Sequence, residues 1–504
     1  MKKVIMVVLG GLGISDSENG NAVKQADMDC FNHLYSEYPK SLLRASGEYV
    51  GLPDNQFGNS EVGFLSIGAG KKIKQDVLIC NENLGNPDIE DNILLNKCIE
   101  ELEETGGRLH LAGLVSDGLV HSDIKYMMNL IGHLKNMGLK ELYFHVITDG
   151  LDVEPNSAKE YIKDLEDVMK QVGLGVIADV CGRFYAMDRD NNWERTKVYS
   201  DLLLKGKAAK VPSYTKAIDA CYKENITDDK LPPFILDEKG KLQENDKLIW
   251  LNFRADRSKQ ILNVLLDNNF KEYLAIIPKN FEVITVVETP GIGDCKSLIK
   301  YEDDIYPLGV YFSELGLSQA RISESLKYSS VSYYFDGAKE VKLKGCDYFE
   351  IPSVDAEDVL KNPELSAREV TKQAIKCLDK DYDFILVNFA NPDILAHTGD
   401  VEATVKGLEV VDDCLEEILE SVNFNFYHMI VTSDHGNCEE MLSKEGETTN
   451  THSLNPVPFI LLDNKYDLKH KGDITQIAPT ILKYMDIAIP KQMQGTKSLF
   501  IEED

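Results

Sequence analysis

Five potential metal ligands stand in three short segments near the carboxyl end of the chain. They are Asp393, His397, Asp434, His435 and His452. Asp393 and His397 are four residues apart, so one helical turn would place both side chains on the same face. Mixed carboxylate and imidazole donors suit Mn²⁺ or Zn²⁺. Each segment alone is more typical of a turn, but three segments so close in sequence favour a metal site.

A possible nucleophile lies far upstream of these ligands. Ser60 stands in the segment Gly58-Asn59-Ser60-Glu61-Val62-Gly63, between flexible residues. Such a serine is either an exposed nucleophile or part of a turn. A nearby metal ion would lower the pKa of the serine hydroxyl and activate it for attack on phosphorus.

Two groups of arginines in the middle of the chain could bind an anion. The four arginines are Arg183, Arg189, Arg254 and Arg257. A guanidinium binds phosphate or carboxylate through a planar fork. The alternative is that these arginines pair with the acids around them, Asp188, Asp190 and Asp256. Both groups follow predicted strands, at residues 176–180 and 248–252, and this position makes the two interpretations about equally good.

Two further polar residues follow predicted strands in the same region. His121 comes after the predicted strand 111–115, and Asp152 comes after the predicted strand 142–147. Imidazole and carboxylate groups can hold hydroxyls or transfer protons at neutral pH. We therefore count both residues as candidates for substrate binding.

The elements that must position these residues alternate along the chain. Short apolar runs predict strands at residues 4–9, 111–115, 142–147, 176–180, 248–252, 283–287, 384–390, 429–432 and 459–462. Amphipathic stretches lie between them, most clearly at residues 408–422. This alternation predicts an α/β architecture with largely parallel sheets. Ligands of such sheets collect at the carboxyl ends of strands, where several of the candidate residues stand.

The composition excludes several classes of function. The chain has 504 residues, 43% of them hydrophobic, with 54 Lys and Arg against 84 Asp and Glu, which gives a net charge of −30. That charge argues against binding to nucleic acid or to an anionic membrane. The apolar run at residues 4–9 is too short to span a membrane, and we expect a buried strand there. Ten cysteines without a C-x-x-C pair predict reduced thiols in a cytoplasmic protein.

The sequence resembles the cofactor-independent (2,3-bisphosphoglycerate-independent) phosphoglycerate mutases of the alkaline phosphatase superfamily. The resemblance extends along almost the whole chain and includes the segments ASGEYVGLPDNQFGNSEVGFLSIGAG, GLVSDGLVHSD, ITDGLDVEP, GRFYAMDRDNNWERT, NFRADRSKQ, LKYSSVSYYFDG, NFANPDILAHTGDVEATVKGLEVVDDCL, TSDHGN and THSLNPVPF. It implies an alkaline-phosphatase-like, metal-binding α/β domain at residues 1–74 and 304–504. It also implies an inserted α/β transferase domain at residues 75–303, which binds the substrate.

The resemblance also implies a mechanism, with two Mn²⁺ ions and a phosphoserine intermediate that links 3-phosphoglycerate to 2-phosphoglycerate. One ion would be held by Asp393, His397 and His452, and the other by Asp434, His435 and Ser60. The residues implied to hold the phosphoryl group are Arg254, Arg257 and Lys327. Those implied to hold the glycerate are His121, Asp152, Arg183 and Arg189, with Asp152 as the proton shuttle. The family further implies a glycolytic enzyme that acts as a monomer on a small phosphorylated substrate.

Four positions depart from the family pattern. Gly10 stands where the family has an aspartate ligand of the serine-side metal, and Leu151 stands where it has a substrate-binding arginine. Phe64 and Ser330 each replace a histidine. The first two changes predict weaker binding of the second metal ion and weaker binding of the substrate. Two alternatives therefore stay open: a phosphatase or mutase that acts on another phosphate ester, and a catalytically inactive paralogue with a binding role.

Overall fold

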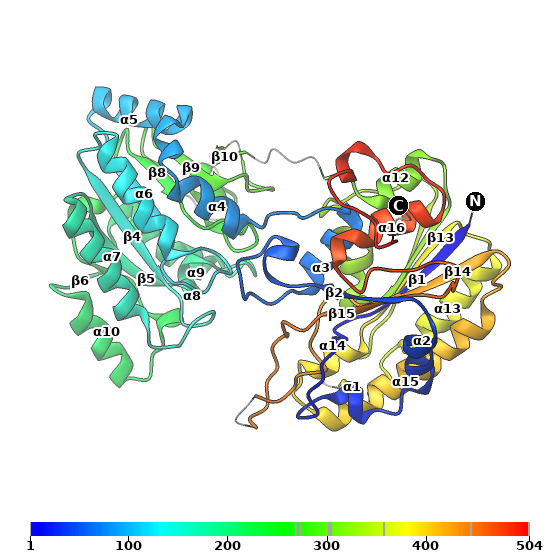
Figure 1. Ribbon diagram of the computed structural model, residues 1–504. Helices are drawn as coiled ribbons and strands as arrows, with labels where there is room; N and C mark the ends of the chain where they lie inside the picture. Colours follow the sequence, from blue (N-terminus) through cyan, green and yellow to red (C-terminus); the bar gives the residue numbers. More distant parts are fainter. Residues whose placement is uncertain are drawn as a thin grey trace. The chain divides into compact units, whose positions relative to one another are not determined.

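The computed structural model divides the chain into two compact units. It describes residues 2–267, 270–272, 275–293, 295–300, 305–355, 358–443 and 446–501. Unit 1 comprises Met1–Lys74 and Asp304–Asp504, and unit 2 comprises Gln75–Asp303. Each unit is built on a sheet of eight strands with helices packed against it (Figure 1). The α/β class expected from the sequence is confirmed.

The sheet of unit 1 has the strand order β12-β11-β13-β1-β14-β15-β2-β16. Its strands are β1 (Lys3–Leu9), β2 (Lys40–Arg44), β11 (Gln319–Glu324), β12 (Cys346–Ile351), β13 (Phe384–Phe389), β14 (Tyr427–Thr432), β15 (Val457–Leu461) and β16 (Lys471–Asp473). Strand β1 lies in the interior of the sheet, parallel to both β13 and β14. The carboxyl ends of these three strands therefore lie together at one edge of the sheet.

Helices cover both faces of this sheet. They are α1 (Ala22–Gln25), α2 (Asp29–Glu37), α3 (Ser60–Ala69), α12 (Leu308–Glu314), α13 (Ala367–Asp379), α14 (Asn391–Ala396), α15 (Val401–Ser421) and α16 (Ile477–Tyr484). Alternate residues of β1 point to opposite faces, as the period of a strand requires. Val4, Met6 and Val8 join the core that includes residues of α3 and α16. Ile5, Val7 and Leu9 join the core that includes residues of α13 and α15.

The sheet of unit 2 has the strand order β10-β9-β8-β3-β4-β5-β7-β6. Its strands are β3 (Leu109–Leu114), β4 (Leu142–Thr148), β5 (Val176–Gly182), β6 (Ala209–Lys210), β7 (Phe234–Ile235), β8 (Lys247–Trp250), β9 (Glu282–Val287) and β10 (Lys296–Ile299). Its helices are α4 (Asp76–Gly85), α5 (Ile93–Thr105), α6 (Ile124–Asn136), α7 (Ala158–Val172), α8 (Arg183–Ala186), α9 (Trp193–Lys205), α10 (Tyr214–Lys223) and α11 (Lys259–Leu266).

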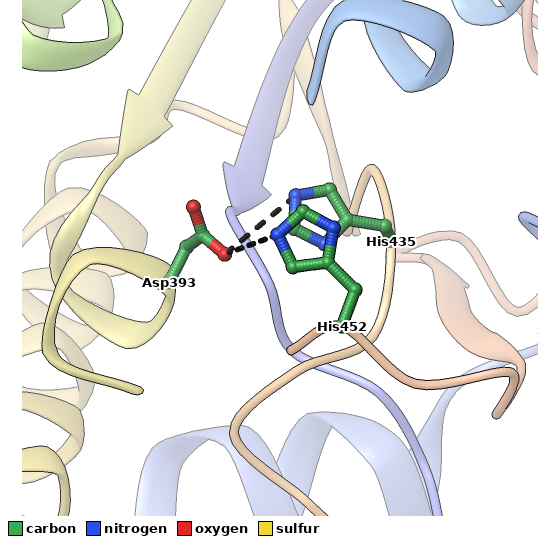
Figure 2. A group of neighbouring side chains, drawn as sticks. All are labelled: Asp393, His435 and His452. Atoms are coloured by element: carbon green, nitrogen blue, oxygen red, sulfur yellow. Dashed lines mark ion pairs between the residues drawn. The ribbon is translucent and has the colours of Figure 1, made fainter. Parts of the chain in front are cut away.

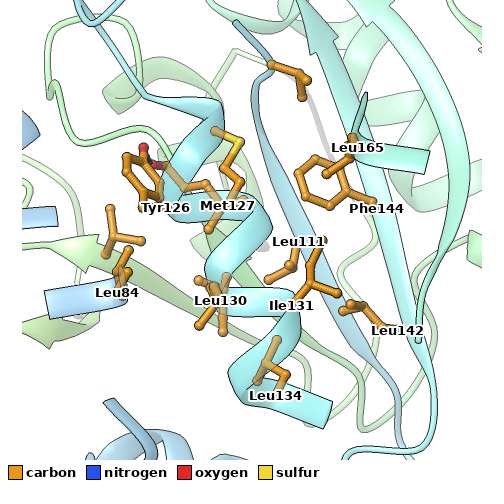
Figure 3. Close-up of a cluster of buried hydrophobic side chains, with 14 of the residues drawn as sticks. Leu84, Leu111, Tyr126, Met127, Leu130, Ile131, Leu134, Leu142, Phe144 and Leu165 are labelled. Carbon is orange, nitrogen blue, oxygen red and sulfur yellow. Dashed lines mark hydrogen bonds between the residues drawn. The ribbon is translucent and has the colours of Figure 1, made fainter. Parts of the chain in front are cut away.

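Apolar side chains from helix and sheet form the core of unit 2. Ile131 of α6 lies on the side of Leu111 of β3 and Phe144 of β4, whereas Leu130 lies on the other side of the helix, toward Leu84 (Figure 3). Leu165 of α7 belongs to the same cluster. This packing fixes the strands whose carboxyl ends carry the polar candidates of this unit.

All nine strands expected from the sequence occur, with ends that differ by a few residues. The amphipathic stretch expected at residues 408–422 is the second part of α15. All ten cysteines are free thiols. Within the described ranges, no helix combines the length and apolar character that a membrane crossing needs.

Candidate active site

Helix α14 and two loops of unit 1 bring the metal-ligand candidates together. Asp393 lies in α14 directly after β13, His435 follows β14, and His452 precedes β15. Figure 2 shows both imidazoles directed at the Asp393 carboxylate, whose Oδ1 lies 3.7 Å from His435 Nε2 and 3.5 Å from His452 Nε2. His397, one helical turn after Asp393, has its Nε2 3.4 Å from the same oxygen. Three of the five sequence candidates, all histidines, thus surround one carboxylate oxygen of a fourth, Asp393.

The hydrogen bonds of two of these rings show that the cluster suits a divalent metal. His452 Nδ1 lies 2.6 Å from the Gly58 carbonyl oxygen, and His397 Nδ1 lies 2.9 Å from the Asn450 carbonyl oxygen. A carbonyl only accepts, so each Nδ1 carries a proton and each neutral ring has its lone pair on Nε2. These two Nε2 atoms face each other at 3.0 Å. A cation would satisfy both lone pairs, so the donor set fits a metal ion.

Ser60 lies beside this cluster as the first residue of α3. The Asn59 side chain caps the helix by accepting a hydrogen bond from the Val62 N–H at 3.0 Å. Ser60 Oγ is 3.0 Å from His435 Nε2. His435 Nδ1 faces the Gly436 carbonyl oxygen at 3.3 Å, so His435 Nε2 can accept the serine proton.

Lys327 joins the serine to the carboxylate. It ends the short helix η5 (Ser325–Lys327) that follows β11. Its Nζ donates to Ser60 Oγ at 2.8 Å and lies 2.5 Å from Asp393 Oδ2. Burial would lower the pKa of Lys327, but Asp393 and Asp434 outweigh burial and raise this pKa. Lys327 is therefore a fixed positive charge beside the serine oxygen.

Gly10, at the end of β1, borders the Asp434 side of the cluster. A Cβ at this position would lie 3.8 Å from Asp434 Oδ1, 3.3 Å from Asn388 Oδ1 and 3.1 Å from the Phe389 carbonyl oxygen. The buried Asn388 Oδ1 accepts no hydrogen bond from the described residues. A carboxylate at position 10 would thus stand next to Asp434, with little room to spare.

In unit 2, Arg183 is held by two carboxylates. Its Nη1 lies 2.5 Å from Asp149 Oδ1 and 2.6 Å from Asp152 Oδ2. Ser116 Oγ donates to the other oxygen of Asp149 at 2.6 Å. Leu151 is 62% exposed and, with Asp152, lines an open cavity of about 380 Å³. The Asp152 candidate is therefore an ion-pair partner of the Arg183 candidate at the edge of an accessible space.

The other candidates of unit 2 surround Asp256. Arg189 Nη1 lies 2.7 Å from Asp256 Oδ2, while Arg254 Nε and His121 Nδ1 lie 3.4 Å and 3.9 Å from Asp256 Oδ1. Burial and the positive charge of Arg183 lower the pKa of His121 to about 3, so this ring is neutral at pH 7.

The fourth arginine, Arg257, lies in the same positive group and donates to the Met187 carbonyl oxygen at 3.1 Å. Burial, Arg189 and Arg183 lower the pKa of Arg257. The unit thus concentrates positive charge around one acidic side chain, Asp256.

The ion pairs of these arginines follow the alternative interpretation in part. Arg189 and Arg254 pair with Asp256, as that alternative expected, whereas Asp188 pairs with Arg195 at 3.2 Å. Anion binding by this group stays a prediction.

Sequence reasoning missed two residues that hold candidates in place. Asn437 Nδ2 donates to Asp393 Oδ1 at 2.8 Å, and Asp149 binds Arg183. Both stand in loops that directly follow predicted strands, next to recognised candidates. Their position at the strand ends was the signal that could have identified them.

Comparisons with known proteins agree with this fold. Residues 80–289 match the family model described as the N-terminus of BPG-independent PGAM. The chain is 40% identical to a 2,3-bisphosphoglycerate-independent phosphoglycerate mutase of Clostridium acetobutylicum, with 99% of each chain covered. It is 38% identical to the protein of that name from Clostridium novyi, again with 99% of each covered.

A solved structure of Leishmania mexicana phosphoglycerate mutase, obtained at low cobalt concentration, has a TM-score of 0.74 to this chain. The identity is 27%, and the match covers 100% of this chain and 98% of the other. The chain belongs to the family of 2,3-bisphosphoglycerate-independent phosphoglycerate mutases. The family expected from the sequence motifs is confirmed.

Proposed function

We propose that this chain interconverts 3-phosphoglycerate and 2-phosphoglycerate through a phosphoserine at Ser60, with the help of bound metal. One observation carries the proposal: Ser60 Oγ lies 2.8 Å from Lys327 Nζ and 3.0 Å from His435 Nε2, within a full-length member of this family. A serine between an imidazole nitrogen and a fixed cation, with its negative charge stabilised, is equipped to attack phosphorus.

In unit 1, the side chains act on the serine oxygen. His435 Nε2 orients the hydroxyl, and the Lys327 ammonium stabilises negative charge on Oγ as the proton leaves. Asp393, His397 and His452 would hold one divalent ion, and Asp434, His435 and Ser60 a second. When bound, such ions lower the pKa of the serine hydroxyl and neutralise charge on the phosphoryl group. We propose Mn²⁺ as the ion.

In unit 2, the arginines and their neighbours would hold the substrate. Arg254 and Arg257 would bind the phosphoryl group, and Arg183 and Arg189 the glycerate carboxylate. His121, neutral because its pKa is lowered to about 3, can donate a hydrogen bond to a glycerate hydroxyl or accept one from it.

Two displacements make up the reaction. In the first, the Ser60 alkoxide forms the Oγ–P bond as the bond from phosphorus to the 3-oxygen of glycerate breaks, and Asp152 gives that oxygen a proton. In the second, the 2-hydroxyl attacks the phosphoserine and gives its proton back to Asp152, and the Oγ–P bond breaks to release Ser60 as the alkoxide. Asp152 is the proposed shuttle because its carboxylate lies beside Arg183 and the accessible cavity.

These roles divide the work between the two units. Unit 1 would be the metal-binding, phosphatase-like domain, and unit 2 the substrate-binding transferase domain. We further propose that the protein works as a monomer in the cytoplasm, in glycolysis and gluconeogenesis.

The decisive experiment is conversion of 3-phosphoglycerate to 2-phosphoglycerate by the purified protein with added Mn²⁺. A chelated sample and Ser60→Ala are the controls. We expect turnover that both controls abolish. Absence of turnover by a folded, metal-loaded protein would contradict the proposal and would leave a binding role.

One observation favours a second candidate, action on another phosphate ester. Leu151 offers no charge at the cavity edge beside Asp152, where the family pattern has an arginine. A substrate without a carboxylate would not need that arginine. Assays with a panel of phosphate monoesters decide the matter: faster turnover of an ester that lacks a carboxylate would support this candidate.

A further inference from the structure

One buried carboxylate outside the ligand set connects the loops of the candidate metal site. Glu439 is fully buried, two residues after Asn437. Its Oε2 accepts hydrogen bonds from the backbone N–H groups of Gly13 and Asn437, both at 2.9 Å. Its Oε1 accepts hydrogen bonds from the Ser453 hydroxyl and from Asn455 Nδ2, the latter at 3.1 Å.

The four donors come from three loops, each of which carries part of the site. Gly13 follows β1 and lies three residues beyond Gly10. Asn437 belongs to the loop of Asp434 and His435, and its side chain donates to Asp393 Oδ1 at 2.8 Å. Ser453 directly follows His452. A single carboxylate thus sets the spacing of three chain segments that are distant in sequence.

The backbone of Gly13 and of Gly436 packs closely against the Glu439 carboxylate. A Cβ at Gly13 would collide with the Glu439 carboxyl group. A Cβ at Gly436 would lie 2.6 Å from Glu439 Oε1 and would also collide with the Ser453 hydroxyl. Only glycine at both positions lets the loops approach the carboxylate closely enough to donate to it.

The chemistry of the four bonds requires a carboxylate. All four partners are donors, and an ionised carboxylate has two oxygens that only accept. An amide of the same shape would turn an NH₂ group toward at least one donor. Buried hydrogen bonds to a charged group are among the stronger ones, and leaving them unmade is costly.

We propose that Glu439 is a positioning residue for the metal ligands, which holds His452 and the Asp434–His435 loop at the spacing that binds the ion. The proposal rests on the proposed function only in taking the cluster to bind metal. Groups that orient metal ligands change metal affinity by about 10–100-fold when they are removed.

The test compares Glu439→Gln with Glu420→Gln in the full chain. Glu420 is an exposed glutamate in the last turn of α15, so its substitution makes the same chemical change away from the buried network. The measurement is the dissociation constant of Mn²⁺ by calorimetry on metal-stripped protein, together with the melting temperature without metal. We expect Mn²⁺ binding to weaken about 10–100-fold in Glu439→Gln and by less than about twofold in Glu420→Gln.

A purely structural role gives a different result. In that case Glu439→Gln would lower the melting temperature but bind Mn²⁺ as tightly as the unchanged protein, and the proposal would be overturned. If Glu439→Gln does not fold, Ser453→Ala removes one of the four donors and should weaken Mn²⁺ binding several-fold. Unchanged affinity in that variant would equally overturn the proposal.

Kinetics separate this proposal from the proposed mutase activity. Turnover of Glu439→Gln at limiting Mn²⁺ should fall and should recover with excess Mn²⁺, while the KM for 3-phosphoglycerate stays unchanged. Metal affinity is measured without turnover, so a protein that lacks mutase activity can still confirm or contradict the role of Glu439.

Discussion

Each unit contains a pair of histidines whose ring nitrogens face each other at the same distance, yet the two pairs differ in what stands behind them. His397 Nε2 and His452 Nε2 are 3.0 Å apart in unit 1, and His110 Nδ1 and His145 Nε2 are 3.0 Å apart in unit 2. In unit 1, backbone carbonyls bind the outer nitrogens. In unit 2, carboxylates do so.

Because carboxylates bind the outer nitrogens of the pair in unit 2, every ring nitrogen of this pair has a hydrogen-bond partner. His110 Nε2 lies 3.1 Å from Asp246 Oδ2, which Arg108 also binds, and His145 Nδ1 lies 2.7 Å from Asp179 Oδ2. Both rings are fully buried, and they come from the neighbouring strands β3 and β4. This pair holds the interior of unit 2 together and leaves no face for a ligand.

The histidine pair of unit 1 is partly exposed, unlike that of unit 2. The His397 side chain is 41% exposed, and both Nε2 atoms point toward the Asp393 carboxylate. That carboxylate raises the pKa of His397, whereas burial lowers the pKa of His110 to about 4. Facing histidines thus suit a metal ion only when their surroundings leave the lone pairs unsatisfied.

The largest effect is expected from Asp393→Asn, which removes the negative charge that His397 and His452 of unit 1 face. We expect turnover to fall by about 10³-fold, because charge stabilisation at a reacting centre contributes on this scale. Calorimetry should show loss of Mn²⁺ binding. Asp246→Asn is the matched change in unit 2 and should leave Mn²⁺ affinity unaltered. Equal loss of binding in both variants would refute the distinction between the two pairs.

His145→Ala should remove the histidine pair of unit 2 without changing the affinity for metal. It leaves Asp179 buried without its partner, and such a loss costs about 3–5 kcal/mol of unfolding free energy. Urea unfolding of the metal-free protein measures this change. A variant with wild-type stability would show that the buried pair contributes little.

The pH dependence of stability should separate the two pairs further. The folded-state pKa of His110 is lowered from 6.5 to about 4. Its contribution to stability is therefore complete above pH 6.5 and is lost as the pH falls toward 4, by on the order of 3 kcal/mol. His110→Gln lacks this titration, so its stability deficit should shrink between pH 7 and pH 4.5 in denaturant unfolding. A constant deficit would contradict this assignment.

The smallest effect is expected from Gly10→Asp, which adds a carboxylate to the candidate metal site of unit 1. We expect Mn²⁺ affinity to rise about tenfold, with a parallel gain in turnover at limiting metal. The contact of the new Cβ with the Phe389 carbonyl oxygen, at 3.1 Å, should cost a little stability. Gly10→Asn is the control without charge. No gain in affinity would show that Gly10 does not limit the site.

The sequence predicted wholly apolar strands better than strands that bury polar side chains. Buried apolar strands such as β1 are visible as hydrophobic runs, but β11 has the sequence QARISE and was missed. Its Arg321 is fully buried because its Nη2 donates to Gln319 at 2.7 Å and its guanidinium lies near the rings of Phe335 and Phe384. Such burial depends on partners that no local pattern reveals.

The candidate site likewise combines side chains that the sequence predicts with partners that it does not reveal. Ligand candidates were predictable because Asp and His at strand ends have a recognisable position and chemistry. The carbonyls of Gly58 and Asn450, which fix the two imidazoles, are backbone groups that any residue carries. Asp256 could not be chosen from among the neighbouring acids because only the fold decides which one the arginines surround.

The position of β1 has a consequence for how the chain folds. Val4 pairs with both Phe384 and His428, so β1 cannot enter its sheet until both segments have been synthesised. Unit 2 is one continuous run and is complete well before then, so it can fold first on the ribosome. Until β13 and β14 emerge, the strand VIMVVL remains an unpaired apolar segment of the kind that aggregates. We therefore expect the yield of this protein to rise when its first strand is shielded during synthesis.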